Sequence, residues 1–183
     1  MAGRIQRELW DVAVDQYGYV TSKDARGLGV NPVELGKLAA RGQLEHVSYG
    51  VYRFAQLPVT PLDSYMLATL WANGRGVLSH DTALDLHEVC DINPSKLHIT
   101  VPGRRPERRG GDQYVVHSEP LAEGEVTWHE GIRIVTVAKA IEQGIASGVS
   151  SHLLTQALQT AQDRGAITEA EHRRLTDDLE ARS

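Results

Sequence analysis

The stretch from Thr21 to Phe54 constrains the fold of this chain more than any other, because two helix starts and a pair of strands follow one another in it. Thr21 is a favourable N-cap, and Asp24 stands where a capping-box partner is expected. The run Asn31-Pro32-Val33-Glu34 predicts a second start, since Asn caps well, Pro suits the first helical position and Glu34 can bond back to the cap. Two glycines between the helices supply a tight turn. The pattern predicts a helix-turn-helix whose second helix ends at Gly42.

A two-stranded ribbon is expected directly after this pair of helices. Its strands would be residues 44–48 and 51–55, which are rich in β-branched and aromatic residues, with Tyr49-Gly50 at the tip. An amphipathic helix over residues 3–16 precedes the pair and supplies further apolar surface. The N-terminal part is therefore predicted to be a winged helix-turn-helix.

The second helix of such a fold enters the major groove of DNA with its N-terminal residues near the base edges. Leu35 and Leu38 fall on the core side, so the opposite side faces outward. Asn can pair with adenine, Glu can accept from cytosine, and Lys can reach guanine or phosphate. A wing arginine would bind phosphate without reading sequence. The predicted DNA-binding residues are Ser22, Lys23, Asn31, Val33, Glu34, Lys37, Arg41, His46, Tyr49 and Arg53; the alternative is that they form solvated faces.

The charge balance excludes a general binder of polyanions. The chain has a net charge of -5, and residues 1–56 hold seven Lys and Arg against six Asp and Glu. Low affinity of a single copy is expected, helped by self-association on DNA or by basic residues elsewhere. The single cysteine, Cys90, excludes an internal disulfide and fits a reducing compartment. Without an apolar run suited to a signal peptide or a membrane span, a soluble cytoplasmic protein is expected.

Two prolines within residues 57–61 predict a short extended linker. The expected domains are therefore a winged head at 1–56, the linker at 57–61 and a C-terminal domain at 62–183. In that domain, strands are expected at 96–101, 113–117, 125–128 and 132–135, and helices at 62–73, from Ser79, at 136–145, from Ser150 or Ser151 to Arg164, and from Thr168. The predicted fold class is α+β, with a small, mostly antiparallel sheet and several helices.

The C-terminal domain carries one motif that suggests a catalytic triad and one basic loop. Ser79-His80-Asp81 cannot form a catalytic triad, because adjacent residues on a helix point in different directions. His80 and His87 share a helix face, but their spacing differs from that of HExxH. A helix start with a buried polar network is expected, with no catalytic residue, metal site or cofactor. The loop arginines would contact DNA phosphate, tRNA or an acidic partner, or form a solvated charge run: Arg104, Arg105, Arg108 and Arg109.

Taken in order, these segments resemble the AbiEi family of antitoxins. The resemblance is carried by SYGVYR, LSHDTALDLHEV, LHITVPGRRPERR and GIRIVTVAKAI. It implies an N-terminal winged helix-turn-helix and a C-terminal α+β domain. It also implies that the protein neutralises a nucleotidyltransferase-like toxin encoded beside it and represses its own operon by binding promoter repeats. The DNA-contacting role would fall on the helix from Asn31 to Arg41 and on the wing around Tyr49 and Arg53. Lys139 lies in the TVAKAI segment, and nothing catalytic follows from it.

Three functions remain open at the level of sequence. The first is an antitoxin and autorepressor without enzymatic activity. The second is a stand-alone winged-helix regulator whose C-terminal domain binds a ligand or dimerises. The third is a metal-assisted nuclease, which is disfavoured because the chain has neither a ligand cluster at helical or hairpin spacing nor a GxxxxGK loop.

Overall fold

The computed structural model describes residues 2–182 and divides the chain into two compact units. Unit 1 runs to Gly76 and also takes in Pro106–Asp112, whereas unit 2 comprises Val77–Arg105 and the chain from Gln113 onward. Residues 57–61 therefore lie within unit 1, and the division into domains at 1–56, 57–61 and 62–183 stays a prediction. Among the residues described, no helix has both the length and the apolar character needed to cross a membrane.

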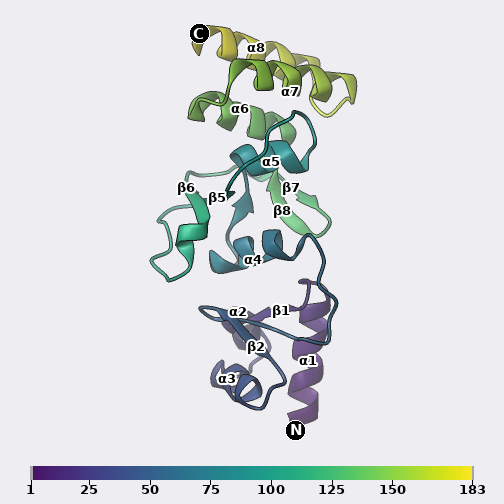
Figure 1. Ribbon diagram of the computed structural model, residues 1–183, viewed down its shortest axis with the longest axis vertical. Helices are drawn as coiled ribbons and strands as arrows, with labels where there is room; N and C mark the ends of the chain where they lie inside the picture. Colours follow the sequence, from purple (N-terminus) through teal and green to yellow (C-terminus); the bar gives the residue numbers. More distant parts are fainter. Residues whose placement is uncertain (1, 183) are drawn as a thin grey trace. The chain divides into compact units, whose positions relative to one another are not determined.

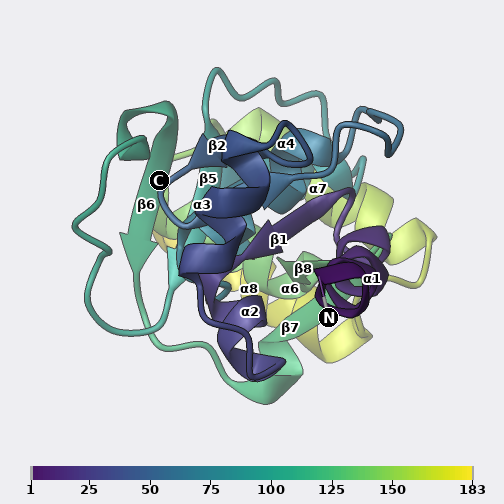
Figure 2. The same ribbon diagram turned by 90° about the horizontal axis from the view of Figure 1, so that it is seen from below.

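Unit 1 contains the predicted winged helix-turn-helix and one further helix. Its sheet has the order β1-β3-β2, and both pairs are antiparallel. The helix α1 is seen almost along its axis in Figure 2. The elements are α1 (Ala2–Val14), β1 (Tyr19–Thr21), α2 (Ser22–Gly27), α3 (Val33–Ala40), β2 (Glu45–Ser48), β3 (Val51–Arg53) and α4 (Asp63–Trp71).

Both helix starts of the helix-turn-helix use the predicted caps. Thr21 and Asp24 form a complete capping box, in which the Asp24 amide donates to Thr21 Oγ1 at 3.1 Å and the Thr21 amide donates to Asp24 Oδ2 at 2.8 Å. Asn31 Oδ1 accepts from the Val33 amide at 3.1 Å. Glu34 does not bond back to this cap, because its carboxylate binds Lys37 instead. Pro32 already has a helical backbone conformation, and α3 begins at Val33.

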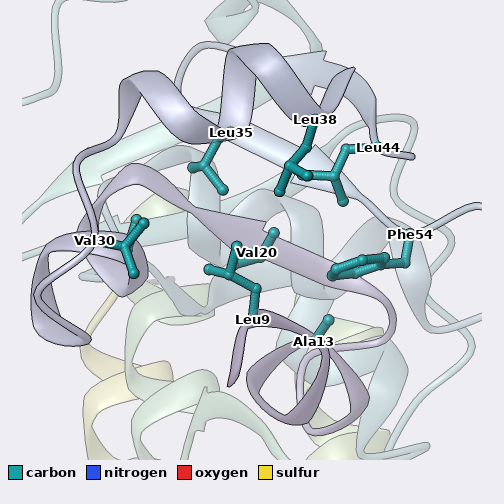
Figure 3. Packing of buried hydrophobic residues seen from close by; sticks show 9 residues of the cluster. Leu9, Ala13, Val20, Val30, Leu35, Leu38, Leu44 and Phe54 are labelled. Carbon is teal, nitrogen blue, oxygen red and sulfur yellow. The ribbon is translucent and has the colours of Figure 1, made fainter. Parts of the chain in front are cut away.

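The core of unit 1 joins its three N-terminal helices to the sheet. Leu9 of α1, Leu35 of α3 and Val20 of β1 are all fully buried, and Figure 3 shows their side chains converging. The ring of Trp10 packs edge-on against Phe54, with the centroids 5.1 Å apart. Burying a leucine side chain stabilises a fold by about 1.5–3 kcal/mol, so these contacts hold α3 in a fixed place on the sheet.

Unit 2 is a five-stranded sheet covered by helices. The strand order is β6-β5-β4-β8-β7, with β5–β6 and β4–β8 parallel and β4–β5 and β7–β8 antiparallel. The α+β class is confirmed, but the sheet is mixed rather than mostly antiparallel, because β5–β6 and β4–β8 are parallel pairs. The strands are β4 (Val77–Leu78), β5 (Leu97–Val101), β6 (Tyr114–Ser118), β7 (Val126–His129) and β8 (Ile132–Val135).

The helices of unit 2 form successive layers. The first, α5 (His80–Leu86), packs on β5 and on α6 (Val137–Ser147). Figure 1 shows α6 together with α7 (Ser151–Asp163) and α8 (Glu169–Arg182), which pack on one another. Thr136 caps α6, and Gly148 ends it in the left-handed conformation, as the sequence predicts for the cap. Two short 3-10 turns lie at Gly111–Gln113 and Glu123–Glu125.

Lys139 lies almost buried among carboxylates at the start of α6. Its Nζ is 3.0 Å from Glu142, 3.4 Å from Glu125 and 4.0 Å from Glu119. Burial lowers the pKa of Lys139, but the hydrogen bond and charge of Glu142 and the other carboxylates outweigh burial and raise it. The lysine therefore stays charged and joins α6 to the segments that carry these glutamates.

Candidate nucleic-acid interface

The outward side of α3 is accessible along its length. Leu35 and Leu38 are buried against the sheet, and the helical period therefore turns the intervening residues towards solvent. Val33 is 61% exposed, and Asn31, Lys37 and Arg41 are also exposed. The predicted base-reading residues thus lie together on one free face of unit 1.

Two charged residues of this face bind each other. Lys37 Nζ is 2.7 Å from Glu34 Oε1, one helical turn earlier. Such an exposed pair stabilises a helix by only about 0.3–0.5 kcal/mol, so either side chain can turn towards a ligand at little cost. Until one of them does so, the Glu34–Lys37 pair has no net charge. Arg41, at the C-cap of α3, is a cation outside this pair.

The predicted wing is formed by β2 and β3. Gly50 turns the tip with a φ of +66°, a conformation that glycine adopts without strain. A register shift between His46 and Ser48 interrupts the ladder. The ring of His46 lies 5.0 Å from that of Tyr52, and Tyr49 at the tip is 65% exposed. His46 and Tyr49 are therefore presented to solvent, as the sequence predicts.

Arg53 is placed differently from the prediction of a phosphate contact. Its side chain is buried in unit 1, where it donates to the carbonyls of Phe54, Leu57 and Pro58 and pairs with Asp63 at 3.4 Å. A buried guanidinium in such a network cannot reach a phosphate without leaving Asp63 unpaired. The prediction for Arg53 is corrected on this ground: the residue ties the wing to the start of α4.

Beside the wing lies a pocket of about 460 Å³ lined by cations. Ser22 and Lys23 from α2 and His46 and Tyr49 from the wing, all predicted as contacts, meet there. The pocket also holds Arg26 and Arg108, and none of the described lining residues is acidic. Sequence reasoning did not select Arg26, although its three-residue spacing from Lys23 places both on one helix face. An anionic group such as a phosphate suits this lining.

The predicted arginine loop does not act as a single patch. Arg104 and Arg105 belong to unit 2 and are exposed, whereas Arg108 and Arg109 belong to unit 1. Arg108 donates to the Trp71 carbonyl at 3.0 Å, and the Trp71 indole donates to the Arg109 carbonyl at 2.8 Å. These two bonds fix the segment against α4, so Arg108 is held in place at the pocket.

The N-terminal part of the chain is similar to a known family. Residues 7–55 match the family model described as "Transcriptional regulator, AbiEi antitoxin". This span runs from α1 to the end of the wing, and the resemblance predicted from the sequence is confirmed over it. The remainder of the chain lies outside the matched residues.

Two further comparisons concern the whole chain. It is similar to the crystal structure of the RV2827C protein from Mycobacterium tuberculosis, with 14% identity and a TM-score of 0.41 over 97% of this chain and 80% of the other. No curated protein matches the chain.

Proposed function

We propose that this protein is a DNA-binding antitoxin that represses its own operon and has no enzymatic activity. The observation that carries the proposal is the exposed face of α3 beside a formed wing, in the span that matches the AbiEi regulator family. Its place of action would be the cytoplasm, where the promoter is. The promoter DNA of its own operon and a neighbouring nucleotidyltransferase-like toxin are the proposed partners.

Repression would rest on α3 in the major groove, with the wing and the pocket on the sugar-phosphate backbone. Asn31, Val33 and the Glu34–Lys37 pair would meet base edges. Lys23, Arg26 and Arg108 would bind phosphate, because they gather in one pocket without an acidic neighbour among the described lining residues. The near-neutral head favours binding by more than one copy, since the charge-driven part of the affinity is small.

The antitoxin role is tested by co-expression. The neighbouring gene is induced alone, with this protein, and with a variant carrying Lys37→Ala and Arg41→Ala, while a reporter records promoter activity. The proposal expects growth arrest by the neighbouring gene, rescue by the wild type and the variant alike, and loss of repression in the variant only. A neighbouring gene that does not arrest growth, or arrest that this protein does not relieve, contradicts the antitoxin role.

The alternative is a stand-alone winged-helix regulator whose C-terminal part binds a ligand or dimerises. The observation that favours it is that unit 2 has its own sheet and helical layers and lies outside the family match. The same experiment separates the two roles. Repression of the reporter without any effect on growth supports the regulator alone.

A further inference from the structure

Three histidines of unit 2 meet at one point. Their ring nitrogens, one from each of His80, His98 and His117, all lie within 4.8 Å of one another. His98 Nδ1 is 3.1 Å from His117 Nε2, and the rings of His80 and His117 are stacked with centroids 3.4 Å apart. His80 is 6% exposed, and the other two are half-buried. Three imidazoles gathered at one point offer three nitrogen atoms that could ligate one cation.

The sheet topology brings these residues together from three separate segments. His80 stands at the start of α5, directly after the central strand β4. The strands β5 and β6 run parallel, with His98 opposite Val115 and Thr100 opposite His117. Because side chains alternate along a strand, His98 and His117 lie on the same face of the sheet. The expectation that no metal site exists rested on spacing along the chain, which does not reveal a cluster of this kind.

Buried hydroxyls hold two of the three histidines. Ser79 Oγ lies 2.9 Å from His80 Nδ1 and accepts from Thr100 Oγ1 at 2.8 Å, and both hydroxyl residues are fully buried. The His98 amide donates to Thr82 Oγ1 at 2.8 Å. When the Nδ1–H of His80 donates to Ser79, its Nε2 presents a lone pair. A second hydrogen bond of this kind is how proteins orient histidines that ligate metals.

The backbone at His80 is held in an uncommon conformation. Its φ is +51°, in the left-handed region that few residues other than glycine adopt, although histidine, asparagine and aspartate do so more readily than most. The His80 amide donates to Oε1 of Gln143 at 3.0 Å, and Gln143 of α6 is itself buried and bonded to Glu119. Strain that the surrounding structure maintains is typical of functional sites.

The charged groups around the cluster include carboxylates that would suit a cation. Asp81 acts on His98 and His117 as a negative charge, and Glu119 acts on His117 in the same way. Lys139 acts on His80 as a positive charge, but it is itself paired with Glu119, Glu125 and Glu142. The two carboxylates would therefore offset part of a cation's charge.

We propose that His80, His98 and His117 form a binding site for a divalent first-row transition metal ion, with Zn²⁺ as the ion to test. Ligand nitrogens about 2.0–2.1 Å from a tetrahedral ion lie roughly 3.3 Å apart, close to the separation of the His98 and His117 nitrogens. Three imidazoles select zinc and its neighbours over Mg²⁺ or Ca²⁺, which prefer oxygen ligands. Three histidines leave the fourth coordination position of a tetrahedral ion for water or for a group from a partner.

The test is metal uptake by the full-length protein purified without a histidine tag. The protein is freed of metal with a chelator and titrated with Zn²⁺ by calorimetry and with Co²⁺ by visible absorption. The wild type is expected to bind one equivalent. The double variant His98→Ala, His117→Ala is expected to bind on the order of 100-fold more weakly, because it loses two of the three ligands. His152→Ala, at an exposed histidine of α7, is the control and should bind as the wild type does.

Two outcomes would overturn the proposal: no stoichiometric uptake by the wild type, or uptake that the double variant retains. Circular dichroism shows whether the double variant is folded. If it is not, X-ray absorption of the zinc-loaded wild type decides the matter. A first shell that contains imidazole nitrogens supports the site, and a shell without them contradicts it.

Discussion

Arg108 lies over the ring of Tyr49, with its guanidinium carbon 5.1 Å from the ring centroid. The two residues are far apart in the sequence, and the hydrogen bond from Arg108 to the Trp71 carbonyl fixes the arginine in this position. The contact gives the exposed wing tip of the head a second support besides its own hairpin. It also places a cation in the pocket that Lys23 and Arg26 line.

Replacing Arg108 with alanine should weaken DNA binding without changing which sequence is preferred. The loss removes one phosphate contact and a cation–π contact of about 0.5–1 kcal/mol. We expect roughly 5- to 10-fold lower affinity and a slope of log K against log salt that is smaller by about 1. Fluorescence anisotropy over a range of salt concentrations measures both. Arg173→Ala, at an exposed arginine of α8, is the control, and an equal effect of that variant would contradict the specific role of Arg108.

Arg53 and Asp63 form an ion pair inside unit 1, and removing the cation alone should be costly. Arg53→Met leaves the Asp63 carboxylate unpaired and is expected to destabilise the protein by about 3–5 kcal/mol. Adding Asp63→Asn removes the orphaned charge and should recover about 1 kcal/mol or more. Urea unfolding followed by tryptophan fluorescence reports on unit 1 through Trp10 and Trp71. A double variant as unstable as the single one would show that the charge is not the cause.

His87 should make the stability of unit 2 depend on pH. Burial lowers its pKa, and this effect exceeds the opposing effect of its hydrogen bond to the Val135 carbonyl. Since the folded-state pKa lies below the unfolded value of about 6.5, the stabilisation is fully present above that value and is lost as pH falls below it. His87→Gln keeps a donor for Val135 but does not titrate.

The stability of His87→Gln should therefore fall less than that of the wild type between pH 7.5 and pH 5. The measurement is the unfolding midpoint in urea at several pH values. His152→Gln, at an exposed position, should follow the wild type. Parallel pH profiles for the wild type and His87→Gln would rule out this histidine as a source of the dependence.

The parts of the fold that local chemistry determines could be predicted from the sequence. The capping box at Thr21, the Asn31 cap and the turn at Gly50 depend on residues a few positions apart, and all three are present. The alternation of residues 97–101 likewise predicted β5. The two-residue strand β4 was not expected, because so short a segment has no period to detect. It lies at the centre of the sheet, where it pairs antiparallel with β5 and parallel with β8.

The features that the sequence did not reveal depend on pairing between distant segments. Arg53 is the last residue of β3, and only the position of Asp63 on α4 explains why its side chain is buried. The histidine cluster depends on the parallel register of β5 and β6, which the sequence does not specify. One signal in the sequence could have indicated the cluster: His98 and Thr100 form a polar face of β5, opposite the apolar face of Leu97, Ile99 and Val101.

The most direct test of the account is binding of the purified protein to its own promoter, measured by fluorescence anisotropy against a shuffled duplex of the same length. We expect specific binding by the wild type and at least a roughly 10-fold loss in the variant Lys37→Ala, Arg41→Ala, since two exposed cations leave the face of α3. Arg173→Ala, at an exposed arginine of α8, should bind as the wild type does. Unchanged affinity of the double variant for the promoter would contradict the assignment of α3 as the helix that binds DNA.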